Sequence, residues 1–295
     1  MAKPTKLMRN NLRSYPIWFT LPLGAIFITL FVIPTVTSLY YATQRWTLFS
    51  TEYVGLENFQ LFLQDPFLQQ GVLHTFIYAF LTSGLKVVVG MFLGVLLMSN
   101  IKFRGFLRNI VFFPVLVSTI GVGITFQSLM KTDVGLIDEA LKVFGVPSEG
   151  LLGNVNTVLY AVVAVDVWKG VGLATVIFIA GMASIPQEYY EAAKMDGVST
   201  MQNFRHIILP LLRPATNTVI ILSLIGGLRT FDLIWAMTGG GPGFASDVLA
   251  SLVYKKYQAG FYGLSTAGNV IMFLLILALI LPLQKFLQKK EQEIQ

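Results

Sequence analysis

Long apolar stretches alternate with short polar ones along this chain, and the pattern predicts its secondary structure. Six windows are apolar over about 20 residues or more, the length that a helix needs to cross the hydrocarbon core of a bilayer. We therefore expect an all-α integral membrane protein with six transmembrane helices. The windows cover residues 17–41, 73–98, 106–130, 157–182, 215–237 and 266–287.

Two windows carry further signals. Pro22 and Pro34 in the first are tolerable in lipid if neighbouring groups bond the carbonyls that prolines leave free. Gly90 and Gly94 in the second form a small-xxx-small face, which predicts close packing against another helix.

The longest polar insertion between two apolar windows, residues 184–213, predicts two short helices joined at a glycine. Ser184 is a suitable N-cap for the first helix. Gly197 is expected to end that helix in the left-handed conformation, which glycine adopts at little cost. Ser199 and Gln202 have the spacing of a capping box for the second helix. We expect a helix–glycine–helix elbow, polar on one side and apolar on the other.

The remaining connections are longer than simple turns. Residues 42–71 are rich in aromatic side chains, and residues 131–156 have helical character around Gly135 to Phe144. Residues 238–263 begin with TGGGPG, which we interpret as a turn rather than a phosphate-binding loop, because it follows a span and lacks a GK[ST] ending.

Composition narrows the class of protein. The chain has 295 residues, of which 55% are hydrophobic and 12% charged, with a mean hydropathy of +0.69. A soluble domain has about 25% charged residues, so little of this chain is left for one. Zero cysteines exclude disulfides, thiolate metal sites and cysteine nucleophiles, and two histidines are too few for an imidazole-rich metal site. The net charge of +6 is typical of cytoplasmic anchoring in a membrane protein, and we expect no nucleic-acid partner.

Basic residues predict the orientation. Thirteen lie on the side of both termini and the elbow, against five on the other side, and the positive-inside rule places the richer side in the cytoplasm. The apolar run after the basic N-terminus is too long for the core of a signal peptide, so we interpret it as a retained first span. The thirteen are Lys3, Lys6, Arg9, Arg13, Lys102, Arg104, Arg108, Lys194, Arg205, Arg213, Lys285, Lys289 and Lys290; the five are Arg45, Lys131, Lys142, Lys255 and Lys256.

Charged residues inside the spans are candidates for function, because each costs about 2.5–3.5 kcal/mol to insert. Asp166 and Lys169 are three residues apart on one helix face, and Arg229 and Asp232 repeat that spacing. One hypothesis is that these are self-neutralised pairs that hold helices together. The other is a polar substrate path, in which aromatic faces and charged groups bind a polyol. The candidate path residues are Asp166, Trp168, Lys169, Asn217, Arg229, Asp232 and Trp235, with no metal ligand among them. Asn217 could instead bond across helices, and Lys86 could snorkel or pair with a neighbour.

Residues 191–210 of the elbow match the pattern E-A-A-x3-G-x9-I-x-L-P at every fixed position, through Glu191, Ala192, Ala193, Gly197, Ile207, Leu209 and Pro210. The segment resembles the EAA loop of type I ABC importer permeases. That resemblance implies that the elbow couples the permease to a cytoplasmic ATPase, with these seven residues and Asp196 at the contact.

Two other segments make the resemblance narrower. Both are similar to segments of MalF-type permeases of maltose and multiple-sugar importers. One is TGGGPG with the Tyr-rich stretch after it, residues 238–261. The other is Val54–Gly55–Leu56–Glu57–Asn58–Phe59. The likeness implies a first helix with its outer loop in residues 1–70, an ABC transmembrane type-1 domain in residues 71–287 and a cytoplasmic tail in residues 288–295. The large outer-loop domain of the enteric maltose subunit is missing, so compact oligosaccharide importers are the better comparison.

The resemblance also implies the other components. The chain has no Walker A sequence, so we expect a transport subunit without a cofactor of its own, and ATP and Mg²⁺ in the partners. The implied partners are a homologous second permease, two ATP-binding subunits, an extracytoplasmic solute-binding lipoprotein, a sugar and membrane lipid. The implied setting is a bacterial or archaeal cell (inner) membrane, with transport by alternating access. The alternatives are a type I importer for another solute such as glycerol phosphate, an ion-coupled secondary transporter, and a structural membrane scaffold.

Overall fold

The computed structural model describes residues 17–132, 134–145 and 150–292 of the chain. The predicted basic residues Lys3, Lys6, Arg9 and Arg13 lie outside the described residues, as do the last three residues of the predicted tail. The described chain is almost entirely helical, as the apolar windows predict, with one small antiparallel hairpin as the exception.

Four helical segments are long and apolar enough to cross a membrane unbroken: Trp18–Ala42, Pro66–Met98, Val158–Ala183 and Tyr262–Glu291. The first is built from η1 (Ile17–Thr20), α2 (Leu21–Phe27), η2 (Ile28–Val32) and α3 (Ile33–Ala42), and the others are α5 (Pro66–Met98), α9 (Val158–Ala183) and α16 (Tyr262–Gln292). With the two bent pairs described next, the number of spans reaches the predicted six.

The predicted third span differs from a straight helix. It consists of α6 (Arg104–Leu116) and α7 (Thr119–Leu129), whose axes meet at 97°. Val117 and Ser118 between them have extended backbones, which a continuous helix does not permit. A hydropathy window registers the composition of such a pair but not its bend.

The predicted fifth span also ends earlier than its window. After a 65° bend, α13 (Arg213–Leu228) follows the end of the elbow. Helix geometry stops at Arg229–Phe231, and α14 (Asp232–Met237) starts anew. The charged pair Arg229 and Asp232 therefore flanks a break in the span rather than one continuous helix face.

Prolines explain two irregular turns. The π-helical turn η2 comes just before the segment with Pro34, and η3 (Phe204–Ile208) comes just before Pro210 in α12 (Leu209–Leu211). A proline lacks the N–H of the regular ladder and crowds the preceding turn, and a π turn relieves both effects.

The central packing joins α5 to α9 and α13, while α13 also packs on α16 and α6 on α9. The small-xxx-small prediction is confirmed: a Cβ added at Gly90 would lie 2.7 Å from the Ala174 Cβ, and one at Gly94 would lie 3.0 Å from the Phe178 Cβ. Both contacts are on α9, so the two glycines allow α5 and α9 to approach closely.

One end of the molecule holds a compact set of short elements. Strands β1 (Gln44–Trp46) and β2 (Thr51–Tyr53) pair antiparallel, with Arg45 opposite Glu52. Helices α4 (Glu57–Gln64) and α15 (Leu249–Gln258) pack beside them against α16. Helix α8 (Leu136–Val143) lies where residues 131–156 predict helical character.

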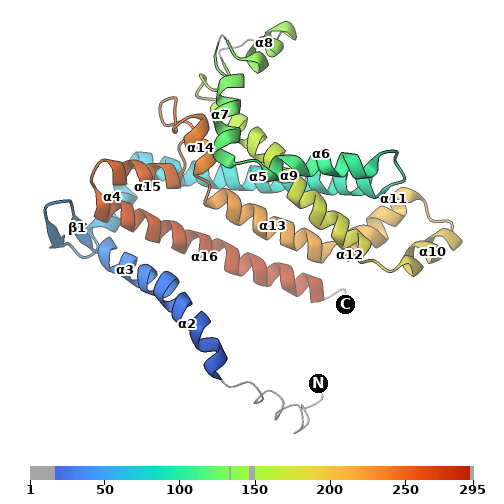
Figure 1. Cartoon of the computed structure of the whole chain (residues 1–295), viewed down its shortest axis with the longest axis horizontal. Coiled ribbons are helices and arrows are strands. Elements are labelled where there is room, and N and C mark those ends of the chain that lie inside the picture. Colours follow the sequence, from blue (N-terminus) through green and yellow to red (C-terminus); the bar gives the residue numbers. More distant parts are fainter. Residues whose placement is uncertain (1–16, 133, 146–149, 293–295) are drawn as a thin grey trace.

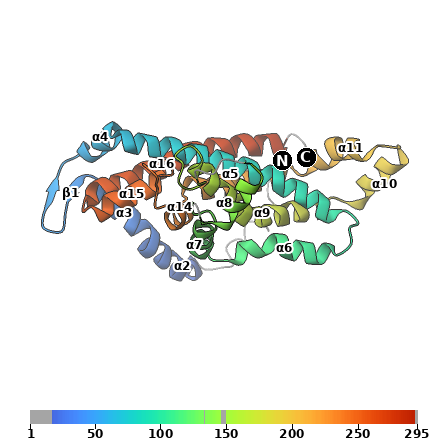
Figure 2. The same cartoon turned by 90° about the horizontal axis from the view of Figure 1, so that it is seen from above.

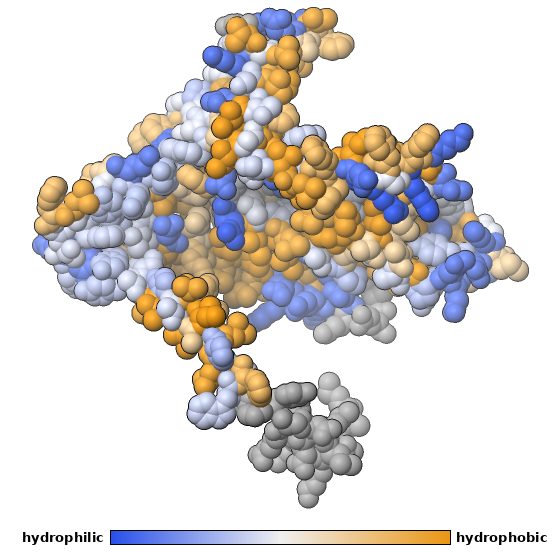
Figure 3. Space-filling view, viewed as in Figure 1, coloured by the Kyte–Doolittle hydropathy of each residue, from blue (hydrophilic) through white to orange (hydrophobic). Residues whose placement is uncertain are grey.

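The hairpin and the elbow lie at opposite ends of the molecule in two perpendicular views (Figures 1 and 2). Helix α7 leads away from the bundle to α8 (Figure 1). Apolar surface dominates the middle of the molecule, and polar surface gathers over the elbow (Figure 3). The hairpin end is drawn mostly in pale colours, which mark residues of intermediate hydropathy. This distribution suits a protein with an apolar belt between two aqueous ends.

Candidate functional sites: the elbow and the broken span

The first half of the elbow has the predicted geometry. Helix α10 (Gln187–Met195) ends before Gly197, whose φ is +68°, and the Val198 N–H donates to the Ala193 carbonyl at 3.0 Å. A Cβ at Gly197 would contact nothing within 4 Å, so backbone conformation alone requires glycine there. Ser184 differs from its predicted role: it is the C-cap of α9, and its hydroxyl donates to the Gly181 carbonyl.

The second half begins as the sequence predicts. Ser199 accepts from the Gln202 N–H, and the Gln202 side chain accepts from the Ser199 N–H, so both halves of the capping box form. This box starts α11 (Thr200–Asn203), which continues through η3 into α12. The elbow is therefore held by its own local bonds.

The elbow exposes a surface suited to docking. Ala193 packs inside the protein, whereas Glu191, Ala192 and Asp196 are exposed. Met195 is 88% exposed and Met201 72%. Flexible apolar methionines beside exposed carboxylates are typical of a contact surface for another protein.

The remaining motif residues lie in the second limb. Ile207 and Pro210 are half-buried and Leu209 is exposed, so this limb lies between the docking surface and α13. The 65° bend that follows sets the angle between the elbow and the span. A movement of the elbow would therefore act directly on α13.

Asp166 has a different partner from the one its spacing suggests. Its carboxylate bonds the Lys86 ammonium of α5 at 2.6 Å, with the two side chains 22% and 11% exposed. Among the described residues, Lys169 forms no ion pair, so the pair that forms joins two helices rather than two turns of one. The role of Asp166 in a substrate path stays a prediction.

The other path residues fall into two regions. Trp168 is 45% exposed and packs on Phe126 of α7, with ring centroids 5.1 Å apart. Trp235 is half-buried beside Phe231 in the broken span. In the part of the chain that the structure describes, Arg229 and Asp232 have no ion-pair partner, and both are exposed. Exposed charges at a break in a span are suited to line a polar cavity.

Asn217 lies far from this region, at the elbow end of α13. Its amide donates to the Glu291 carboxylate at 3.0 Å and to the Leu287 carbonyl at 3.4 Å. Arg213 reinforces the same contact by donating to the Lys290 carbonyl at 3.1 Å. The structure therefore places Asn217 in a link between α13 and α16, as the alternative hypothesis anticipates.

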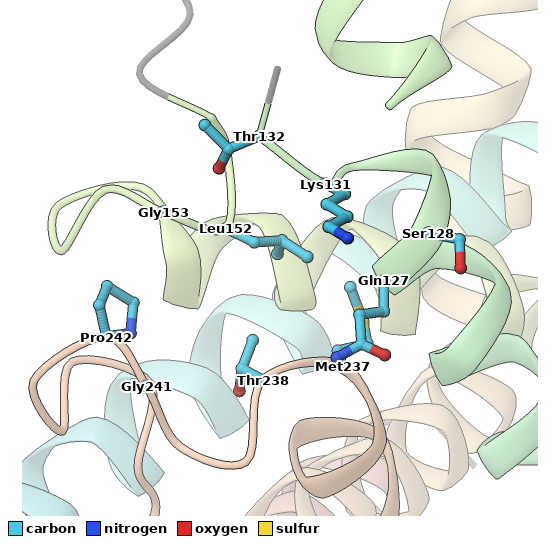
Figure 4. A pocket seen from close by; sticks show the side chains of 10 residues that line it. All are labelled: Gln127, Ser128, Lys131, Thr132, Leu152, Gly153, Met237, Thr238, Gly241 and Pro242. Atoms are coloured by element: carbon cyan, nitrogen blue, oxygen red, sulfur yellow. The ribbon is translucent and has the colours of Figure 1, made fainter. Parts of the chain in front are cut away.

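A polar cavity of about 540 Å³ opens between the end of α7 and the loop after α14 (Figure 4). Its walls present an amide, three hydroxyls and the Lys131 ammonium, groups that can bond a polyhydroxylated solute. Sequence reasoning did not select these residues, because they come from three separate stretches of the chain and carry no common pattern. They are Gln127, Ser128, Lys131, Thr132, Leu152, Gly153, Met237, Thr238, Gly241 and Pro242.

Sequence reasoning also did not select two residues that follow the TGGGPG segment. One is Ser246, whose hydroxyl donates to the Gly241 carbonyl at 2.6 Å, and the other is Asp247. Asp247 is buried, and its carboxylate accepts from the Ser251 hydroxyl at 2.7 Å and from the Lys255 ammonium at 2.6 Å. The segment itself turns through positive-φ glycines at 239, 240 and 243. Its turn chemistry therefore supports the predicted breaker.

The fold defines a polytopic membrane protein with a short helical elbow exposed at one end. Residues 86–292 match the family described as binding-protein-dependent transport system inner membrane component. The chain belongs to this family, whose members are transport components of ABC importers, and it is an integral membrane protein.

Individual relatives agree over most of the chain. It is 33% identical over 260 residues to the trehalose/maltose transport system permease protein MalF of Thermococcus litoralis, covering 88% of both chains. It is 30% identical to the sn-glycerol-3-phosphate transport system permease protein UgpA of Yersinia pestis, covering 93% of this chain and 94% of that one. A solved bacterial transporter that imports the polysaccharide alginate shares the fold, with a TM-score of 0.81, 18% identity and coverage of 97% and 99%.

Proposed function

We propose that this chain is the membrane-spanning permease subunit of an ATP-driven importer for sugars. A second permease would complete the pore, two ATPase subunits would bind the elbows from the cytoplasm, and a solute-binding lipoprotein would deliver the sugar. The observation that carries the proposal is the elbow: an exposed surface around Glu191, built on a left-handed glycine, joined through one bend to a broken span.

The mechanism follows from how the elbow is built. Its two halves are rigidified by the capping box and by the turn at Gly197. Closure of an ATPase dimer would carry the elbow as a unit, and α13 would follow because it starts one residue after α12. Two arrangements of the spans, each favoured by a different ATPase state, amount to coupling between distant sites.

Variants of the elbow test this proposal. Glu191→Lys should place a repulsive charge at the ATPase contact, and Gly197→Val should misdirect α11, because a β-branched residue is strained at positive φ. Both should insert in the membrane at normal levels but lose ATPase recruitment and binding-protein-stimulated uptake. The measurements are ATPase pull-down and sugar uptake in membrane vesicles.

The chain offers a matched control for each change. Glu188→Lys makes the same charge change on an exposed residue one turn earlier in α10, outside the motif. Gly197→Asn retains a residue that tolerates the left-handed conformation, and its side chain meets open space. Both controls should retain uptake. Normal ATPase recruitment and normal uptake in Glu191→Lys and Gly197→Val would contradict the proposal that the elbow is the ATPase contact.

One observation favours a phosphorylated solute instead. Arg229 is exposed in the broken span without an ion pair among the described residues, and an arginine is suited to a phosphate. A glycerol phosphate permease is also among the relatives. The Asp232 carboxylate beside it favours a neutral solute. Uptake competition between a neutral sugar and glycerol phosphate in the intact transporter separates the two.

A further inference from the structure

An apolar groove of about 630 Å³ lies between α5 and the second limb of the elbow. The α5 residues that line it recur at helical spacing, so they form one face and the groove follows the helix axis. From Val87 to Val95 this face is about 12 Å long. None of the described residues that line the groove is charged. They are Val87, Val88, Met91, Phe92 and Val95 of α5, and Thr200, Met201, Asn203, Phe204 and Ile208 of the elbow.

The groove has a packed floor and an open rim. The side chains of Met91, Val95 and Ile208 pack against the buried cluster beneath it. At the rim, Val88 is 67% exposed and Phe92 is 65% exposed. The groove is therefore a fixed feature of the bundle that none of the described residues covers.

One polar atom at the elbow wall of the groove lacks a partner. The Asn203 side-chain oxygen is buried and has no hydrogen-bond partner among the described residues. Buried polar atoms in folded proteins are nearly always bonded, so a donor from a ligand in the groove would complete this one. Thr200 presents a hydroxyl on the same wall. The groove thus suits a molecule with a long apolar part and a polar head.

Basic residues follow the C-terminal end of α5, a few residues beyond the groove. Lys102 and Arg104 are both exposed. The Arg108 guanidinium donates to the Leu97 carbonyl at 3.0 Å, so the first turns of α6 pack on the end of α5. Arg104 lies one turn before Arg108 on the same face of α6, and its charge therefore lies near this end of α5.

These cations are not neutralised within the described part of the chain. Lys102, Arg104 and the exposed Arg205, which follows Phe204 on the elbow wall, form no ion pair there. The first turn of α6 carries no acidic residue, and the helix dipole at that end favours an anion. The acidic residues of the elbow lie on α10 and its C-cap, which do not line the groove: Glu188, Glu191 and Asp196.

We propose that the groove binds an anionic phospholipid, with one acyl chain along α5 and the phosphate at the basic residues. Acyl chains in a bilayer run along the spans, as this groove does. Basic pockets between helices at the membrane surface bind anionic headgroups. The hydroxyls of a phosphatidylglycerol headgroup can donate to the Asn203 oxygen. The inference assigns one lipid site and does not depend on the importer function.

A lipid in this site contacts a span on one side and the elbow on the other, so it holds the two together. A ligand favours the arrangement to which it binds best, and this lipid would favour the arrangement of the elbow seen here. Hydrogen exchange in residues 200–211 should therefore slow when phosphatidylglycerol is added, while exchange in β1 and β2 stays unchanged.

Native mass spectrometry tests the site directly, on the protein purified with the subunits that accompany it and titrated with phosphatidylglycerol or phosphatidylcholine of the same acyl chains. The wild type should bind phosphatidylglycerol more tightly. Arg104→Gln and Arg205→Gln should each weaken phosphatidylglycerol binding about fivefold and leave phosphatidylcholine binding unchanged, because each removes one cation from the headgroup. Val88→Trp should fill the groove from its exposed rim and weaken the binding of both lipids.

Two variants outside the groove are matched controls. Lys289→Gln removes an exposed cation from the C-terminal part of α16, and Leu281→Trp adds the same ring to an exposed position on that helix. Both should bind the two lipids like the wild type. Equal binding of the two lipids by the wild type, or binding that no groove variant changes, would overturn the site. So would loss of a subunit from Val88→Trp with unchanged lipid binding, since the groove would then be a protein interface. Solute uptake enters none of these outcomes, so the importer proposal is tested separately.

Discussion

Asp166 and Lys86 illustrate how charged side chains are kept inside apolar helices. Lys86 extends toward α9 across Gly170, where an added Cβ would lie 2.6 Å from the lysine Cε. The ammonium then reaches Asp166, so neither charge faces lipid alone. At this scale a single small residue decides whether a buried pair can form.

The ion pair predicts the direction in which stability changes when one partner is replaced. Asp166→Asn or Lys86→Met alone should destabilise the protein by about 3 kcal/mol, because one charge is left buried without its partner. The double variant should recover part of this loss. Thermal unfolding in detergent measures the effect, with Lys169→Met as the control. A fall in uptake without any loss of stability in Asp166→Asn would instead favour the substrate-path hypothesis.

Among the elements, the hairpin region shows why the segment of residues 54–59 has its composition. Asn58 is buried, and its amide donates to the Ala42 and Gln44 carbonyls at 2.9 Å each. Gly55 has a φ of +61°, and the Val54 N–H donates to the Thr43 carbonyl. The segment therefore ties the end of the first span to α4 and sets the place of β1.

Removing that tie should loosen this region alone. Asn58→Ala leaves two buried carbonyls without their donor, which should cost about 2 kcal/mol. We expect faster hydrogen exchange in residues 42–58 and unchanged exchange in α10–α12. Gln60→Ala, on the exposed face of the same helix, is the control. Uniform destabilisation of the whole chain would contradict a local role.

For the whole molecule, the elbow and the hairpin region lie at two opposite ends. The elbow end carries the motif, and the C-terminal part of α16 is bonded to α13 there through Asn217. The opposite end carries the hairpin and α15. The apolar surface between them is the part suited to lipid.

Reporter fusions test the orientation that the basic residues predict. Reporters placed after Gln295 and near Met201 should be active in the cytoplasm, and one near Phe49, which is 96% exposed beside the hairpin turn, should be active outside. The positive-inside asymmetry is the physical reason. External activity from the Gln295 or Met201 fusion would reverse the orientation.

Much of this architecture can be predicted from local physics. Apolar windows locate the spans, because insertion into lipid depends on summed hydropathy over a helix length. Gly197, Ser199 and Gln202 act within a few residues of one another, so their geometry is readable in the chain. The elbow motif and the family followed from such short-range features.

The remainder depends on contacts between distant segments. The partner of Asp166 is 80 residues away, and no spacing rule links it to Lys86. The 97° bend at Val117–Ser118 leaves hydropathy almost unchanged, because apolar residues continue on both sides. At Arg229–Phe231 charged residues lower the hydropathy, but a charge inside a span does not by itself predict a break in the helix. The ring contacts of Trp46 with Tyr262 and of Trp235 with Tyr254 also join different elements. Such features arise when helices pack, since side-chain neighbours in space are selected by the shape of the whole bundle and not by their order along the chain.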